Sequence, residues 1–180
     1  MQKTAPLIVL LATLFAFRLG SAATTTAPQP PAAETPASQI TKTSTSPGWA
    51  SRCVSDSRKG PLVCSAEESL VWTNTGQTIA TVAVRTQNDT NQTSMLIRTP
   101  VGIYLPAGIS IQIDDGRLQF VPLQTCDSQG CFAETEIAEH ELAALKTGKQ
   151  LSIMCENSSR HKIVLPFPLD SFAEAFQKIQ

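Results

Sequence analysis

The sequence predicts an all-β domain, a sandwich or a barrel, with one or two short helices near the C-terminus. From Trp49 onward, short runs of alternating apolar and polar residues follow one another, separated by clusters of turn residues. There are about eight such runs, which is typical of a sandwich or barrel rather than an α/β fold. Five cysteines follow a stretch with the features of an export signal, so we also expect disulfides.

The alternation defines the individual strands. Residues 78–85, 109–113 and 151–155 each carry apolar side chains at every second position, which places those side chains on one face. Asp115-Gly116 predicts a hairpin turn that leads into a strand at 118–120, and residues 161–165 form the last predicted strand. The apolar sets that share a face are Ala80, Val82 and Val84; Ile109, Ile111 and Ile113; and Leu151, Ile153 and Cys155.

Two segments have the pattern of short helices. Residues 138–146 place Leu142 and Leu145 three apart, and Gly148 ends this helix. Ser171 and Glu174 have the spacing of a capping box at the start of a second helix. One side of that helix presents Phe172, Ala175, Phe176 and Ile179.

Residues 1–22 have the three parts of a cleavable secretory signal. Lys3 supplies a basic start, residues 6–17 form an almost unbroken apolar run, and small residues follow at 20–23. The run is shorter than the roughly 20 residues that span a bilayer. We predict cleavage after residue 22 or 23. Arg18 is a departure from the usual pattern, and an uncleaved membrane anchor is the alternative.

Residues 23–47 are predicted to be a disordered tether. Between Thr24 and Pro47 the chain has five prolines, seven threonines and almost no large apolar side chain. Such a segment cannot offset the conformational entropy that ordering removes. The alternative is an O-glycosylated stalk or a proline-motif ligand. One folded domain is predicted to follow, over residues 48–180.

The charge balance excludes two classes of partner. Lys3 and Arg18 lie in the predicted signal, so 12 of the 14 basic residues face 15 acidic ones after cleavage, a net charge of −3. A mildly acidic chain without a basic stretch predicts neither nucleic-acid binding nor stable membrane insertion.

The cysteine spacing predicts two disulfides. Cys53 and Cys64 flank a loop between two predicted strands, and Cys126 and Cys131 flank a bend that contains a glycine. We therefore predict the pairs Cys53–Cys64 and Cys126–Cys131, each contributing on the order of 2–3 kcal/mol. A zinc site is the alternative, but neither spacing is that of the usual thiolate knuckle. No metal or other cofactor is expected.

Cys155 is left as a free thiol. Its strand places it with Leu151 and Ile153 on the core face, where a thiol packs as a small apolar side chain. A thiol in apolar surroundings keeps a high pKa and stays unreactive. The functional alternatives are a nucleophile or an intermolecular bridge.

Five motifs, in order, resemble the invasion-associated locus B family of Gram-negative bacteria, and they cover roughly residues 47–179. They are Trp49-Ala50-Ser51-Arg52-Cys53 with Cys64 as the next cysteine; Leu105-Pro106-Ala107-Gly108 before a strand; Cys126-Asp127-Ser128-Gln129-Gly130-Cys131-Phe132-Ala133; Leu142-Ala143-Ala144-Leu145-Lys146-Thr147-Gly148; and Val164-Leu165-Pro166-Phe167-Pro168-Leu169 followed by Phe172. The tether and Cys155 depart from the family pattern as we know it.

The resemblance implies an immunoglobulin-like β-sandwich in the periplasm, at the outer membrane or secreted. It carries no catalytic residue over to this chain. We expect the partner to be an unknown envelope or host protein, and the protein to be a monomer or a weak oligomer. The family name comes from host-cell invasion by a pathogen, so a role in virulence is an expectation from the name.

No catalytic constellation stands out. His140 and His161 are interpreted as solvated surface residues, and the Asp114-Asp115 pair is explained by turn geometry. The tryptophans, Trp49 and Trp72, are interpreted as packing residues. An acidic stretch is interpreted as a solvated face, with a basic partner as the alternative; it contains Glu134, Glu136, Glu139 and Glu141.

We therefore predict a non-enzymatic binding or interaction module. The alternative is an exported enzyme, either thiol-dependent through Cys155 or a hydrolase whose site forms only in the folded chain.

Overall fold

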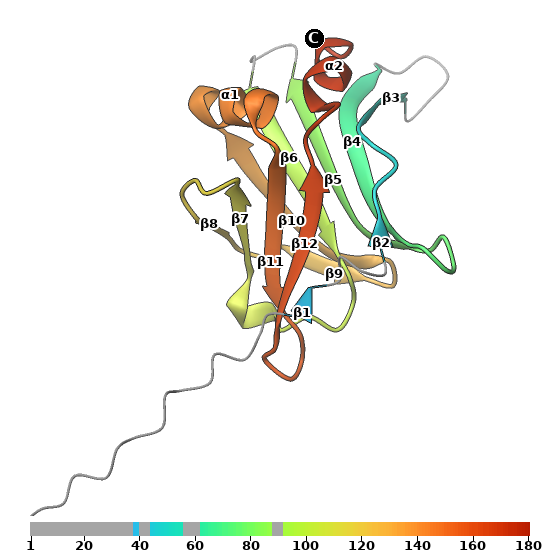
Figure 1. Cartoon of the computed structure of the whole chain (residues 1–180), viewed down its shortest axis with the longest axis vertical. Helices are drawn as coiled ribbons and strands as arrows, with labels where there is room; N and C mark the ends of the chain where they lie inside the picture. Colours follow the sequence, from blue (N-terminus) through green and yellow to red (C-terminus); the bar gives the residue numbers. More distant parts are fainter. Residues whose placement is uncertain (1–37, 40–43, 56–61, 88–91) are drawn as a thin grey trace, which may run out of the picture. The chain divides into compact units, whose positions relative to one another are not determined.

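Two β-sheets packed face to face contain most of the residues that the structure describes (Figure 1). The structure is a computed structural model, and it describes residues 38–39, 44–55, 62–87 and 92–180. All of these belong to one unit, Thr35–Gln180. The predicted signal peptide lies outside the described residues.

The smaller sheet has five strands in the order β1-β12-β11-β7-β8. β1 is parallel to β12, and the other neighbours are antiparallel. The strands are β1 (Ser38–Gln39), β7 (Ile109–Ile113), β8 (Gln119–Val121), β11 (Gln150–Glu156) and β12 (Lys162–Pro168).

The larger sheet has the order β2-β4-β5-β6-β10-β9, and β3 also pairs with β4. β2 and β3 share one edge of β4, because β2 pairs with Val71 and Trp72 while β3 pairs with the part from Val63 to Glu67. The strands are β2 (Ser44–Thr45), β3 (Ala50–Val54), β4 (Val63–Trp72), β5 (Thr78–Gln87), β6 (Gln92–Thr99), β9 (Thr125–Asp127) and β10 (Gly130–Ile137).

Alternate residues of the strands fill the interior between the sheets. Every inward position predicted from the alternation is buried except Ile113, which is half-buried. Because strand side chains alternate between faces, a period of two in the sequence becomes one apolar layer in the fold. The predicted all-β sandwich is confirmed. Its largest fully buried apolar side chains are Phe167, Phe172, Phe176, Met95, Ile97, Ile109, Leu145, Leu151, Ile153 and Leu165.

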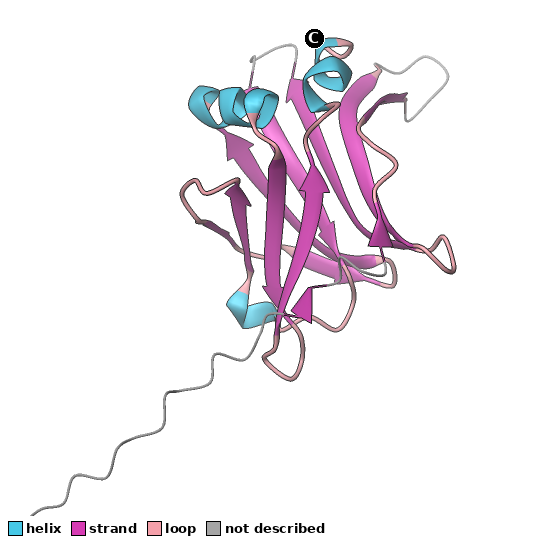
Figure 2. Cartoon of the chain, in the orientation of Figure 1, coloured by secondary structure: helices cyan, strands magenta, loops and turns pink. Residues whose placement is uncertain are grey.

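Two short α-helices cover one end of the sandwich, and a 3₁₀ turn, η2 (Leu105–Ala107), precedes β7 (Figure 2). They are α1 (Glu139–Thr147) and α2 (Phe172–Gln177), which contact each other. Glu141 accepts a hydrogen bond from the Ala138 amide at 2.9 Å, so its carboxylate caps the start of α1. Among the described residues, no helix is long and apolar enough to cross a membrane.

The predicted capping box of α2 is wrong. Ser171 makes no side-chain cap, because its Oγ accepts a hydrogen bond from the Trp49 amide at 3.0 Å. Glu174 instead pairs with Lys178 at 2.8 Å, one turn further along the helix. A tertiary contact has therefore replaced the local one that the spacing suggested.

Most of the predicted tether lies outside the described residues, but its C-terminal part does not. β1 pairs with Ile163 and Val164 of β12, and β2 pairs with β4. Both short strands fall within the range predicted as tether. The folded domain therefore takes up part of that range.

Candidate functional site

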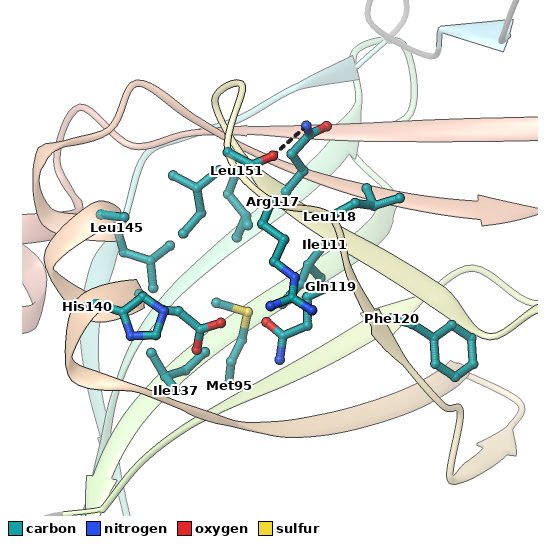
Figure 3. Close-up of a pocket in the computed structure, with 15 residues that line it drawn as sticks. Met95, Ile111, Arg117, Leu118, Gln119, Phe120, Ile137, His140, Leu145 and Leu151 are labelled. Atoms are coloured by element: carbon teal, nitrogen blue, oxygen red, sulfur yellow. Dashed lines mark hydrogen bonds between the residues drawn. The ribbon is translucent and has the colours of Figure 1, made fainter.

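A cleft of about 650 Å³ lies between α1 and the β7–β8 hairpin, and we call it the α1 cleft (Figure 3). Its floor is apolar and comes from both sheets and the helix. Met95 and Ile137 are contributed by β6 and β10, Ile111 and Leu151 by β7 and β11, and Leu145 by α1. A volume of this size is in the range of small-molecule sites.

Polar side chains surround the mouth of the α1 cleft. Figure 3 shows Arg117 and Gln119 on the hairpin side and His140 on the helix side, with Met95 between them in this view. Glu141 is already engaged in capping α1. Within the part of the chain that the structure describes, the Arg117 guanidinium has no hydrogen bond or ion pair. The mouth thus offers one unpaired cation.

Asp114 fixes the hairpin rim against the end of α1. Its backbone has a positive φ of 47°, and its carboxylate accepts hydrogen bonds from the amides of Lys149 and Gln150 at 2.9–3.2 Å. Gly148 lies so close that an added Cβ would be 2.9 Å from Ile113 Cγ2 and 3.0 Å from Asp114 Oδ2. The rim of the cleft is therefore set by hydrogen bonds rather than by a free loop.

These contacts account for the predicted Asp114-Asp115 pair. Asp114 acts within the turn and Asp115 is exposed beside it.

The two histidines are not brought together, since His140 is on α1 and His161 follows the far end of β11; both are exposed. Within residues 44–55, 62–87 and 92–180, no three His, Cys, Asp or Glu side chains are grouped as metal ligands.

Both predicted disulfides are present, and each ties an outer strand of the larger sheet to its neighbour. Cys53 lies directly opposite Cys64 across β3 and β4, and Cys126 directly opposite Cys131 across β9 and β10. The Asp127 carboxylate accepts the amides of residues 129 and 130, which closes the second hairpin. The bridges hold the two edges of the sheet where strand pairing ends.

Cys155 is a free thiol in the core. It is 5% exposed on β11, and burial raises its pKa to about 11. Its neighbour across the ladder is Ile163, an apolar side chain. At neutral pH the sulfur therefore stays protonated and poorly nucleophilic.

The acidic stretch is divided among several roles. Glu134 pairs with Arg85 at 2.6 Å on the outer face of the larger sheet, and Glu141 caps α1. Glu136 and Glu139 are exposed. The predicted solvated face therefore holds only for these two residues.

Trp49 packs, as predicted, and also ties two parts of the chain together. Its ring meets Phe172 edge-on at 4.8 Å, and its Nε1 donates to the Pro168 carbonyl at 2.7 Å. Trp72, at the end of β4, is half-buried against the core.

Glu68 is a residue that the sequence reasoning missed. It is 1% exposed, and neither carboxylate oxygen has a hydrogen-bond partner. Burial is the main cause that raises its pKa from 4.5 to about 7; the Gly48 amide opposes this, and the charge of Asp170 adds to it. The strand alternation could have found it, because Glu68 has the parity of Ala66 and Leu70.

The comparisons with known proteins agree with this fold. The profile of the invasion-associated locus B (IalB) protein family matches residues 49–180. Invasion protein B homologs from two strains of Brucella abortus are each 27% identical over 150 residues, covering 83% of this chain and 85% of the relative.

A solved structure has the same fold. The crystal structure of invasion-associated protein B from Bartonella henselae superposes with a TM-score of 0.63 at 21% identity, over 73% of this chain and 89% of that one. At this identity the likeness concerns the fold alone. The family profile spans the whole described domain from Trp49 onward, and on that match the chain belongs to the invasion-associated locus B family.

Proposed function

We propose that this protein is an exported, non-enzymatic binding module of the bacterial envelope, and that its α1 cleft binds an amphipathic anion. The apolar part of such a ligand occupies the floor, and its carboxylate or phosphate group meets Arg117 at the mouth. The wider role is an interaction with an envelope or host component that carries or presents such a molecule.

The observation that carries this proposal is an unpaired guanidinium beside an apolar cleft. Arg117 has no carboxylate partner in the described chain, whereas Glu141, the one acidic residue of the cleft lining, is committed to α1. A guanidinium matches the planar geometry of a carboxylate or phosphate and binds it through two hydrogen bonds. A cleft with an apolar floor and few polar groups at its mouth is the usual form of a small-molecule site.

Two further observations support a binding role over catalysis. Cys155, the thiol proposed for an enzyme, is buried and protonated, and it does not line the α1 cleft. The cleft lining has a single histidine, His140, and no serine or cysteine beside it to act as a nucleophile. Nucleophilic catalysis needs a nucleophile and a base side by side, and the lining has only the histidine.

Export is supported by the disulfides and by the N-terminal sequence. Two cross-strand bridges are typical of proteins that fold in an oxidising compartment. The Brucella relatives carry the name invasion protein B homolog, which supports a place at the boundary between bacterium and host.

The test is an isothermal titration calorimetry experiment in which dodecanoate is titrated into the oxidised protein. We expect saturable binding at one site, with dodecan-1-ol binding at least tenfold more weakly because it lacks the charge. Arg117→Gln should weaken dodecanoate binding by about tenfold, in line with the roughly 1.5–3 kcal/mol of a charge-assisted hydrogen bond. Lys162→Gln is the matched control. Lys162 is the first residue of β12 and does not line the cleft, so this variant should bind normally.

A second pair of variants tests the location. Ala144 lines the cleft and is half-buried, whereas the neighbouring Ala143 is exposed and outside it. Ala144→Leu should fill the cleft and abolish binding, and Ala143→Leu should not. Equal binding by both variants, or no saturable binding of dodecanoate by the parent protein, would refute the proposed site.

A further inference from the structure

We propose that residues 46–49, which we call the clasp, form a pH-sensitive cover over Glu68: the clasp docks when this carboxyl is protonated and opens when it is ionised. The device is separate from the α1 cleft and does not depend on any ligand.

The clasp crosses a gap in the pairing of β4. β2 pairs with β4 up to Val71, and β3 pairs with it from Glu67, so the three residues between have no strand partner on this edge. The chain from β2 to β3 spans this gap as a four-residue loop. It is therefore free of the sheet ladder that holds the segments on either side.

Trp49 makes most of the contacts that hold the clasp down, and its side chain is 6% exposed within the hydrophobic core. The Trp49 amide donates to Ser171 Oγ at 3.0 Å, its Nε1 donates to the Pro168 carbonyl at 2.7 Å, and its ring packs on Phe172. Ser46 Oγ is buried without a hydrogen-bond partner. These contacts join the clasp to the end of β12 and to α2.

Glu68 lies beneath the clasp, and its carboxyl group has no hydrogen-bond partner or counter-ion among the described residues. Both carboxylate oxygens are buried and lack a hydrogen-bond partner; the Gly48 amide faces the group without reaching hydrogen-bond geometry with either oxygen. A buried carboxylate in this state is strongly disfavoured unless water or a donor reaches it. Opening the clasp would admit water without breaking the pairing of β4 with β5.

The surrounding charges reinforce the effect. Asp170, between β12 and α2, repels an ionised Glu68. On α2, Glu174 and Lys178 pair with each other and are exposed.

The remaining neighbours of β4 bring no cation to Glu68. Arg52 of β3 is exposed and pairs with Glu67 on the other face. The residue opposite Glu68 on β5 is Val82, and the titratable residue of β12, Lys162, lies at the far end of that strand. No described group thus neutralises the carboxylate.

The direction follows from the raised pKa of about 7 in the closed state, against 4.5 for a hydrated carboxyl. Below pH 4.5 the group is protonated whether the clasp is open or closed. Between 4.5 and 7 only the open state loses its proton, so rising pH favours opening. For these two values the opening equilibrium increases by about 70-fold from pH 5 to pH 8.

The experiment is hydrogen exchange of the full chain with intact disulfides, read by mass spectrometry and expressed as protection factors at pH 5 and pH 8. We expect protection of the Trp49 amide and its neighbours in the clasp to fall by up to about 70-fold over this range, with β5 and β6 unchanged. Glu68→Gln cannot ionise and should show nearly constant protection. Glu67→Gln, the adjacent outward carboxylate, should behave like the parent protein.

Three outcomes would overturn the proposal: constant clasp protection in the parent protein, the same fall in Glu68→Gln, or an equal loss of protection across the whole domain. If Glu68→Gln does not fold, Asp170→Asn provides the test. It retains Glu68 but removes the repulsion, which lowers the pKa of Glu68 in the closed state. The loss of clasp protection should then level off at a lower pH, and the fall between pH 5 and pH 8 should be smaller than in the parent protein. An unchanged profile in this variant would also count against the proposal.

Discussion

Replacing Glu68 with glutamine should change how the stability of the domain depends on pH. The substitution keeps the shape of the side chain and removes its ionisation. In the folded protein the pKa of this carboxyl is raised from 4.5 to about 7, chiefly because it is buried. Protons therefore stay bound to the folded state over a range in which the unfolded chain has already lost them.

The magnitude follows from this difference. Each pKa unit corresponds to about 1.4 kcal/mol, so the interval between 4.5 and 7 amounts to at most about 3.5 kcal/mol. Asp170 lies at an exposed turn nearby, which allows some screening by water. We therefore expect the effect to be about 2–3 kcal/mol. This stabilisation is complete below pH 4.5 and is lost as pH rises through 7.

The assay is urea unfolding of the oxidised protein at pH 4 and pH 8, followed by tryptophan fluorescence. The difference in unfolding free energy between Glu68→Gln and the parent should grow by about 2–3 kcal/mol in favour of the variant at pH 8. Other carboxylates titrate in both proteins, so their contributions cancel in this difference. Glu67→Gln provides the control, and a constant difference between Glu68→Gln and the parent at both pH values would refute the reasoning.

Other predictions concern the core and the hairpin at β9. Gly130→Ala should destabilise the domain by about 1–3 kcal/mol in thermal unfolding, because the new Cβ would lie 2.3 Å from the Thr99 carbonyl oxygen. Gly76→Ala is the control, because φ is also positive there but no atom lies within 4 Å of the new Cβ. Comparing the two variants separates the steric clash from the effect of the backbone conformation. Cys155 should react with iodoacetamide at pH 8 only after denaturation, as measured by intact mass, and rapid labelling of the native protein would contradict its burial. Removing the Cys126–Cys131 bridge by paired alanine substitution should lower the unfolding free energy by about 2 kcal/mol, from its separation of 5 residues, and no change in urea midpoint would show that the hairpin is held by its ladder alone.

The sequence was sufficient for the elements that obey local rules. The period of two in β7 and β11 specifies which side chains face the core, because a strand places alternate residues on opposite faces. The cysteine pairs were also predictable, since each pair is separated by a single short loop and hairpin strands bring such positions opposite one another.

The sequence was insufficient where a partner comes from a distant part of the chain. Ser171 has the spacing of a helix cap, yet its hydroxyl binds the Trp49 amide, which is 122 residues away. The short pairings of β1 and β2 depend on exposed edges of β12 and β4, and a Thr/Pro-rich segment carries no local sign of them. The all-β class and the two disulfides follow from local patterns.

The sequence by itself determined the fold class, the strand faces, the disulfide pairs and the five motifs shared with the invasion-associated locus B family. Each of these depends on residues that are near one another in the chain or on a strict repeat. Only the tertiary structure decided the α1 cleft, the unpaired Arg117 at its mouth and the lack of a hydrogen-bond partner for the Glu68 carboxylate under the clasp. These features arise where four or more elements meet. Whether a charged side chain in such a place finds a partner depends on packing between distant segments, which the order of residues along one strand does not specify.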